Sequence, residues 1–151
     1  MDINQKYLVA PEDVRNVISA SGNRIGVEIL MKIPYYRGVA LSMIDELYVK
    51  IDNQMYPKET LTFTVDGFSY RWPAIETVTT FRWEYGEKAK IFVPIEGGLE
   101  VTPVRHLEIG CAIRMSYGPR KPFPCVVKID VDPCQMGTVH YHGQEVEYYG
   151  N

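Results

Sequence analysis

Apolar and polar residues alternate along most of this chain, a pattern typical of β-strands with one buried and one solvated face. The clearest case is residues 24–33, "RIGVEILMKI". One face of this segment would carry only apolar side chains, namely Ile25, Val27, Ile29, Met31 and Ile33. The opposite face would carry Arg24, Glu28 and Lys32. Further strands are predicted by the same pattern in residues 46–52, 60–70, 87–93, 107–117, 125–132 and 138–149.

Turn signals separate these segments, and helical spacing is scarce. Asp66-Gly67 is a strong hairpin dipeptide. Gly110 interrupts the polar face of its strand and is interpreted as a bend or bulge. Only residues 11–19, "PEDVRNVIS", have the composition of a short helix of two turns, and residues 40–47, "ALSMIDEL", would form one turn or a loop.

Seven or eight short strands joined by turns indicate an all-β protein, an antiparallel β-sandwich or jelly roll with little helix. Neither a repeat nor a linker divides the 151 residues, so a single domain covering residues 1–151 is expected. A doubly wound parallel sheet is excluded, because it needs long helices between its strands.

Composition narrows the class further. The chain is 46% hydrophobic and 23% charged, as in ordinary soluble proteins. Its net charge of −3 gives no electrostatic case for a nucleic acid or an anionic membrane as partner. The N-terminus lacks the features of a signal peptide, and no apolar run approaches the roughly 20 residues of a membrane span. Three cysteines, at positions 111, 125 and 134, suit free thiols, so a cytoplasmic protein is expected.

The residues "TVHYHGQE" raise the question of a metal site. His140 and His142 share one side of a predicted strand, as two metal ligands from one strand must, and Glu145 follows. Cupin jelly rolls use a His-x-His pair, a Glu and a later His. Here Glu145 follows too closely and no later His exists, since the third histidine is His106. A polar strand face is therefore favoured over a metal site.

Other catalytic signatures are weak. The chain has no Gly-x-Ser-x-Gly elbow, and Gly97-Gly98 lacks the Lys and helix of a phosphate-binding loop. Acidic pairs could do acid–base work as in glycosidases, but Asp45 and Glu46 would face apart on a strand, Glu84 and Glu87 flank a turn, and acids at loop ends are usually surface residues. The sequence therefore predicts no catalytic residue in this chain.

Aromatic residues gather in loop-like stretches instead: "PYYRG" at 34–38, "YRWP" at 70–73 and "FRWEYGE" at 81–87. Tyr, Trp and Arg are enriched at protein interfaces, because each combines a large apolar area with a polar end. The same residues also suit stacking on a sugar or a flat polyphenol, or plugging the ends of a sandwich. All three uses remain open from the sequence.

Several motifs occur in a characteristic order between residues 33 and 117. They are Tyr-Arg-Gly after a strand, "LSMIDEL", a short strand ending in Ile-Asp, a Phe-x-Val-x-Gly hairpin, Trp-x-x-Gly and Gly-Gly-Leu. In this order and spacing the chain resembles the small β subunit of bacterial C-glycoside deglycosidases. The resemblance covers more than half of the chain and is strongest over residues 33–117.

The resemblance implies a β-sandwich that works as part of a larger enzyme. The partner α subunit would be a barrel like those of sugar isomerases, which binds a divalent metal, typically manganese, and holds the catalytic base. Pairs of α and β subunits would assemble into a higher-order hetero-oligomer. The complex would be a lyase that cleaves the carbon–carbon bond between sugar and aglycone in 3-oxo-C-glucosides of flavonoids or isoflavonoids. This chain would then need no cofactor of its own.

The matching motifs also indicate which residues meet the α subunit or approach its substrate. These are Tyr35, Tyr36 and Arg37, with Trp83 and Tyr85 as further candidates. Two alternatives remain beside this hypothesis. One is a stand-alone carbohydrate-binding sandwich that stacks surface Tyr and Trp on sugars. The other is a cupin-like metal enzyme that uses His140, His142 and Glu145.

Overall fold

The computed structural model describes residues 8–35, 37–80, 82–99, 104–114, 122–141 and 146–147, with only the backbone of 122–124 and 146–147. The strands are β1 (Val14–Ile18), β2 (Arg24–Lys32), β3 (Val39–Ala40), β4 (Ile44–Ile51), β5 (Gln54–Pro57), β6 (Thr62–Val65), β7 (Phe68–Tyr70), β8 (Arg82–Trp83), β9 (Lys88–Pro94), β10 (Arg105–Arg114), β11 (Pro122–Val131), β12 (Gly137–His140) and β13 (Val146–Glu147). Short 3₁₀ turns separate some of them: η1 (Pro11–Asp13), η2 (Leu41–Met43), η3 (Lys58–Thr60), η4 (Ala74–Thr77) and η5 (Pro133–Gln135).

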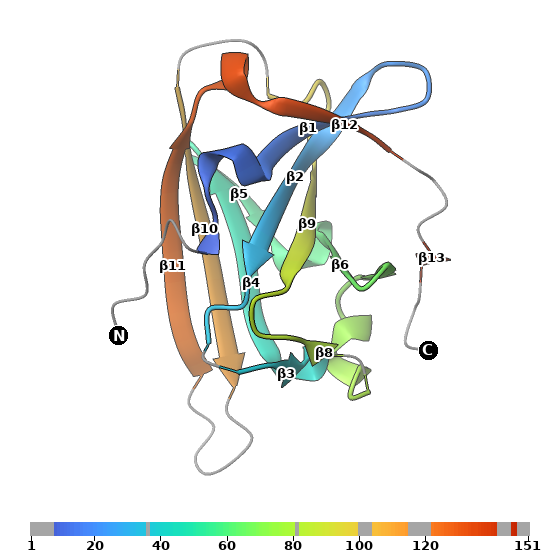
Figure 1. Cartoon of the computed structure of the whole chain (residues 1–151), viewed down its shortest axis with the longest axis vertical. Coiled ribbons are helices and arrows are strands. Elements are labelled where there is room, and N and C mark those ends of the chain that lie inside the picture. Colours follow the sequence, from blue (N-terminus) through green and yellow to red (C-terminus); the bar gives the residue numbers. More distant parts are fainter. Residues whose placement is uncertain are drawn as a thin grey trace.

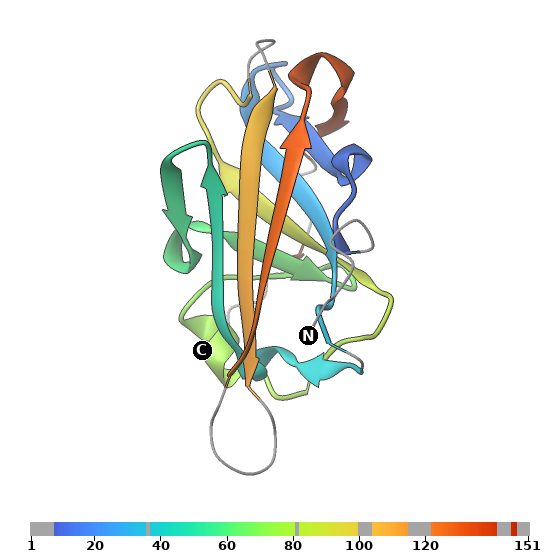
Figure 2. The same ribbon diagram turned by 90° about the vertical axis from the view of Figure 1, so that its left-hand side faces the viewer.

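Two large sheets pack face to face and form a β-sandwich (Figure 1). One sheet has the strand order β12-β1-β2-β9-β6-β7-β13, and the other has the order β11-β10-β4-β5. The strands of the first sheet run obliquely behind those of the second (Figure 2). A separate pair, β3 and β8, lies at one end of the sandwich. The predicted all-β sandwich with little helix is confirmed.

The alternating pattern correctly identified the core. Val27 and Ile29 of β2 and Leu47 and Val49 of β4 are all buried between the two sheets. Each such side chain stabilises the fold by roughly 1.5–3 kcal/mol relative to an exposed one. The polar face of β2 differs from the expectation, because Glu28 is only 4% exposed. The outer face of the seven-stranded sheet is therefore not a simple solvated surface.

Ile25 is the exception on the apolar face of β2. Between β1 and β2, Val17 pairs with Gly26 but Ile18 pairs with Arg24, so the register skips Ile25. Such a β-bulge redirects the side chain of the extra residue. Ile25 is half-buried outside the core and lines a pocket on the outer face of the sheet. The sequence shows no sign of this bulge, because it arises from the pairing with β1, a segment whose composition suggested a helix.

The two segments with helical composition form little helix. Residues 11–19 contain η1, and the rest of the segment is strand β1. Val14 of β1 is buried in the core and Val17 is buried on the outer face of the sheet, which outweighs the weak helix preference of so short a segment. Residues 40–47 form η2 followed by the start of β4, in agreement with one turn. The edge strand β5 was not predicted.

The C-terminal segment differs most from the expectation of one antiparallel strand. β12 pairs in parallel with β1 at one edge of the seven-stranded sheet, and β13 pairs in parallel with β7 at the other edge. The remaining strand pairs of this sheet are antiparallel. β12 and β13 therefore lie at opposite edges of the same sheet.

All three cysteines carry free thiols. Cys111 and Cys125 lie directly opposite each other on β10 and β11. Burial raises the pKa of both thiols, so neither is a reactive thiolate at neutral pH. In the part of the chain that the structure describes, no helix has the length and apolar character needed to cross a membrane.

Gly110 has a packing role rather than the predicted bend. It lies opposite Tyr48 of β4, and a Cβ atom at position 110 would come within 2.0 Å of the Tyr48 ring. The nearby register shift falls at Ala112/Ile113 instead. The Tyr48 hydroxyl donates a hydrogen bond of 2.5 Å to Glu108. This bond, with smaller contributions from burial and the Glu108 charge, raises the pKa of Tyr48 to about 12 and holds the ring over the glycine.

Gly110→Ala is expected to lower the free energy of unfolding by about 1–3 kcal/mol, because the added methyl group must displace the Tyr48 ring. The cost should largely disappear in a Tyr48→Ala background, in which the obstructing ring is absent. Urea unfolding of the four proteins of this double-mutant cycle measures both values. An equal cost in the two backgrounds would contradict the assigned contact.

Candidate functional site: the β3–β8 end and the outer pocket

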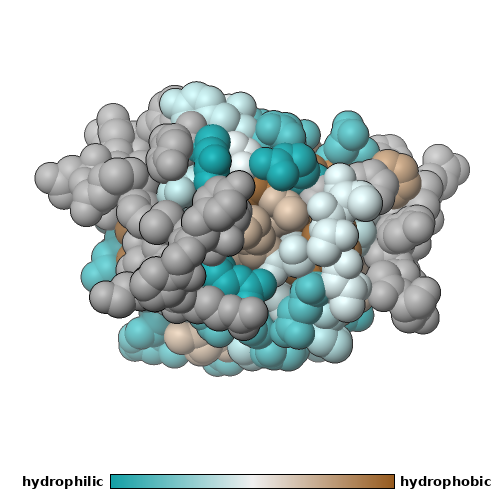
Figure 3. Space-filling model, turned by 90° about the horizontal axis from the view of Figure 1, so that it is seen from below, coloured by the Kyte–Doolittle hydropathy of each residue, from teal (hydrophilic) through white to brown (hydrophobic). Residues whose placement is uncertain are grey.

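Two of the three aromatic stretches, residues 34–38 and 81–87, are far apart in the sequence but meet at one end of the sandwich. Val39 of β3 pairs with Trp83 of β8, and Ala40 pairs with Arg82. This pairing places residues 34–38 next to the turn at residues 84–87. We call these two segments, together with β3 and β8, the β3–β8 end; it lies at the bottom of Figure 1. Figure 3 views the molecule from this side and shows hydrophilic residues around a small apolar centre.

Polar contacts fix the two loops to each other. The Arg82 guanidinium donates a hydrogen bond of 2.8 Å to the Gly38 carbonyl and forms an ion pair of 3.4 Å with Glu84. The glycine of the Tyr-Arg-Gly motif allows a close approach, because a Cβ atom at position 38 would lie 3.1 Å from the Trp83 carbonyl and 2.4 Å from the carboxylate of the flexible Glu84 side chain. The loop at 34–38 is therefore built to fit against the neighbouring turn.

The turn at residues 84–87 is held by its own backbone and by Trp83. The Glu87 N–H donates to the Glu84 carbonyl at 3.0 Å, and the Glu84 N–H donates to the Glu87 carboxylate at 3.1 Å. The Trp83 indole N–H donates to the Glu87 carbonyl at 3.0 Å. Gly86 has a φ of 83°, which favours glycine. Glu87 thus stabilises the turn, and no acid–base pair with Glu84 needs to be invoked.

The predicted interface residues fall into two groups. Trp83 is fully buried, with its ring edge-to-face against Phe63 at a centroid distance of 5.2 Å, and Tyr35 is 6% exposed. These two side chains belong to the core and have almost no surface to offer a partner. Tyr85 is 58% exposed and Arg37 is also exposed. Tyr36 lies outside the described residues.

An exposed Tyr and Arg on loops anchored to the core are features of a protein-binding surface. The buried Trp83 fixes the base of the turn, so that Tyr85 projects from a rigid support. The prediction that this end meets another subunit therefore depends on Arg37 and Tyr85. Trp83 and Tyr35 are buried and hold the two loops on the core.

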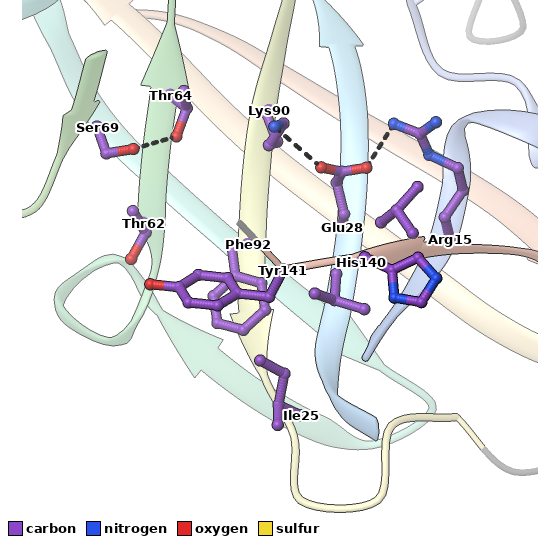
Figure 4. A pocket seen from close by; sticks show the side chains of 12 residues that line it. Arg15, Ile25, Glu28, Thr62, Thr64, Ser69, Lys90, Phe92, His140 and Tyr141 are labelled. Carbon is purple, nitrogen blue, oxygen red and sulfur yellow. Dashed lines mark hydrogen bonds and ion pairs between the residues drawn. The ribbon is translucent and has the colours of Figure 1, made fainter. Parts of the chain in front are cut away.

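A pocket of about 600 Å³, of which the alternating pattern gives no sign, lies on the outer face of the seven-stranded sheet. We call it the outer pocket; Figure 4 shows it from close by. Its lining includes Arg15, Glu28, Thr62, Lys90, Phe92 and Tyr141. These residues come from β1, β2, β6 and β9 and from the end of β12. The alternation placed Glu28 on an outer face, but only the strand register reveals that the others gather around it.

The histidines do not gather in the described structure. His140 is exposed on β12 and lines the outer pocket. His142 and Glu145, the other two candidate ligands, lie outside the described residues. His106 lies on β10 of the other sheet, where it forms an ion pair of 2.6 Å with Asp130. The described residues contain no group of three His, Cys, Asp or Glu side chains that could hold a metal ion.

The acidic pair at 45–46 is engaged in ion pairs. Asp45 pairs with Arg114 at 3.6 Å, and Glu46 pairs with Lys58 at 3.4 Å. Adjacent residues of a strand point to opposite faces, so the two carboxylates cannot act on one substrate bond. Their contacts instead connect β4 to its surroundings.

Trp83→Ala is expected to lower the free energy of unfolding by about 3–5 kcal/mol, because it leaves a large cavity in the core. The matched control is Tyr85→Ala, two residues away, which should change stability by no more than about 0.5 kcal/mol. Urea unfolding of both variants tests the division between core and surface residues. Similar losses in the two variants would refute it.

The pH titration of His106 offers a second test. The hydrogen bond and charge of Asp130 raise the pKa of His106 above its usual value of 6.5. Protonated His106 therefore favours the folded state below that pH, and the effect is lost as the pH rises through the higher folded-state pKa. In Asp130→Asn the pKa should fall, as followed by NMR of the imidazole protons, with the His140 signals as control. An unchanged titration of His106 would contradict the pair.

Comparison with known proteins places the chain in a family. The family described as C-glycoside deglycosidase beta subunit matches residues 4–117. A C-glycoside deglycosidase beta subunit of Eubacterium cellulosolvens is 26% identical over 136 residues, which cover 90% of this chain and 88% of that protein. One of Arthrobacter globiformis is 21% identical over 92 residues, or 61% of this chain and 70% of that protein. The family match starts at residue 4 and so also includes β1 and β2. The chain belongs to the C-glycoside deglycosidase β-subunit family.

Proposed function

We propose that this chain is the β subunit of a heteromeric C-glycoside deglycosidase and is required for turnover without holding the catalytic base. The observation that carries the proposal is the family match over residues 4–117, since a subunit of that name works within a complex. The partner is a catalytic α subunit that binds a divalent metal, with manganese the expected ion. Pairs of the two subunits assemble into a larger hetero-oligomer.

The proposed reaction is an elimination on a 3-oxo-C-glucoside of a flavonoid or isoflavonoid. The 3-keto group acidifies the neighbouring C2–H, so that a base of the α subunit can remove this proton. The electron pair then forms the C1–C2 double bond, and the C1–aryl bond breaks. The aromatic carbon leaves with the electrons of that bond and is protonated. The metal of the partner supplies electrophilic assistance when bound.

The contribution of this chain is made through the β3–β8 end. Arg37 and Tyr85 provide charge, hydrogen-bonding capacity and apolar area on a rigid base, which suits a hot spot of an interface. Tyr36 belongs to the same Tyr-Arg-Gly motif and is included in the proposed contact by its place in the sequence. These residues are also proposed to approach the substrate. A variant that keeps its affinity for the α subunit but loses turnover would separate this role from docking alone.

A reducing, cytoplasmic setting fits this role. Three cysteines suit free thiols in a reducing compartment. We place the complex in the cytoplasm, where the oxidoreductase that forms the 3-keto group can also act.

The first experiment measures turnover of a 3-oxo-C-glucoside, such as 3-oxo-puerarin, in the presence of manganese. The chain is assayed alone and after co-purification with the product of its neighbouring gene. Activity only in the co-purified sample is expected, and chelation of the metal should abolish it. Activity of the chain alone would contradict the assignment of the catalytic base to the partner. No activity and no complex would contradict the proposed function.

The interface is tested with Arg37→Ala and Tyr85→Ala. Loss of a hot-spot side chain costs about 2 kcal/mol, so each variant should weaken the complex roughly 30-fold. The matched control is Met55→Ala, because Met55 is 47% exposed on the edge strand β5 and belongs to neither the β3–β8 end nor the outer pocket. Dissociation constants and turnover rates are measured for all three. Full retention of binding and turnover by both interface variants would exclude the β3–β8 end as the docking surface.

A further inference from the structure

The outer pocket is built from side chains that the strand register brings into line. Arg15 of β1 lies opposite Glu28 of β2, which lies opposite Phe92 of β9, which in turn lies opposite Thr62 of β6. These four residues therefore form one row across the sheet. Since neighbouring strands lie about 4.8 Å apart, the row spans roughly 15 Å, enough for a six-membered ring and its substituents.

A parallel row supplies further polar groups. Lys90 lies opposite Thr64, and Thr64 lies opposite Ser69, whose hydroxyl is 2.7 Å from that of Thr64. Glu28 joins the two rows, because its carboxylate contacts the Arg15 guanidinium and the Lys90 ammonium at once (Figure 4). Its side chain is only 6% exposed. The pocket thus presents a carboxylate, two cations and several hydroxyl groups, all fixed in place.

The pocket contains unused hydrogen-bonding capacity. Arg15 Nε is buried and has no hydrogen-bond partner among the described residues. The Thr62 hydroxyl points toward the pocket in Figure 4, and no interaction of it is found in the described part of the chain. Arg15 Nε has almost no accessible surface, so it is not reached from the pocket, whereas the half-buried Thr62 hydroxyl is open to a polar ligand or ordered water. A hydroxyl-bearing ligand would give the Thr62 hydroxyl a partner.

Two aromatic rings provide the apolar surface. Phe92 lies over Gly26, where a Cβ atom would come within 2.7 Å of the Phe92 ring, so glycine at this position lets the ring lie flat on the sheet. Tyr141 follows β12, and its backbone N–H donates to the Ile18 carbonyl at 2.7 Å. In Figure 4 the Tyr141 ring extends into the pocket toward Thr62. The rings leave space beside the charged groups, as in pockets that bind small polar molecules.

We infer that the outer pocket binds a neutral pyranose ring of the glucose type. The C–H face of such a ring can pack on Phe92 and Tyr141, while its hydroxyl groups meet Glu28, Thr62 and Lys90. A neutral ligand fits better than an anionic one, because Glu28 already engages both cations. A bare aromatic ring would leave the polar rows without partners. The inference does not depend on the proposed function, because the pocket lies entirely within this chain.

The test uses the full chain without its partner and methyl β-D-glucopyranoside as the probe. Two other probes are titrated in parallel. Glucuronate represents an anionic sugar, and phenol represents an aromatic ring without the hydroxyl groups of a sugar. Saturable binding of the glucoside is expected with a dissociation constant on the order of 1 mM, as for a ligand of this size. Amide chemical shifts in NMR report both affinity and location, and the shifts should concentrate on β2, β6, β9 and the end of β12.

Variants identify the groups responsible. Tyr141→Ala should weaken binding at least tenfold, whereas Tyr141→Phe, which keeps the ring, should retain most of the affinity. Thr62→Val removes one hydroxyl from a surface strand without changing its size and should weaken binding severalfold. Tyr85→Ala is the matched control, since it removes an exposed Tyr at the β3–β8 end and should leave binding unchanged.

Three results would overturn the inference. The first is no saturation at a glucoside concentration 50-fold above the expected dissociation constant. The others are binding of glucuronate or phenol without binding of the glucoside, and equal affinity of the Tyr141→Ala and wild-type proteins for the glucoside. If the glucoside binds while the complex shows no turnover, the pocket assignment stands and the deglycosidase proposal fails. If the complex turns over while the glucoside does not bind to this chain, the deglycosidase proposal stands and the pocket assignment fails. The two proposals therefore fail separately.

Discussion

Contact between two apolar sheet faces is the constraint on which the rest of the molecule depends. β2 and β9 of one sheet and β4 and β10 of the other direct branched aliphatic side chains into a common core. Because strand side chains alternate, the same packing directs every second residue outward. Glu28, Lys90 and Phe92 are placed in the outer pocket for this reason. The inward packing thus fixes the positions of the outward groups, and any shift of register would disperse them.

The two candidate surfaces are separated by the same architecture. The β3–β8 end is formed by loops at one end of the sandwich, and Trp83 connects it to the core through Phe63. The outer pocket lies on the broad face of the larger sheet and depends on the strands alone. A partner bound at the end and a small molecule bound on the face would therefore meet different parts of the chain. In such an arrangement a subunit can carry both contacts without rearrangement of its core.

Sequence analysis was successful where structure is decided locally. The alternation in residues 24–33 identified Val27, Ile29 and Met31 as core residues, since burial on one face needs no knowledge of the partner strand. It did not reveal the bulge at Ile25, which depends on the register with the neighbouring β1, or the parallel pairing of β12 and the role of Gly110, which depend on the register between distant segments. In the aromatic stretches, composition could not tell the buried Trp83 from the exposed Tyr85.

The placement of β12 and β13 affects how copies of this chain can associate. An unpaired edge strand offers its N–H and C=O groups to any extended peptide, and short edge strands limit this risk. Here the edges of the larger sheet are occupied by strands of four and two residues from the C-terminal segment. On the smaller sheet the long edge strand β11 begins with Pro122 and Pro124, which have no N–H to donate. The larger sheet therefore offers little edge backbone for extension between molecules, whereas residues 125–131 of β11 leave a longer run of edge backbone on the smaller sheet.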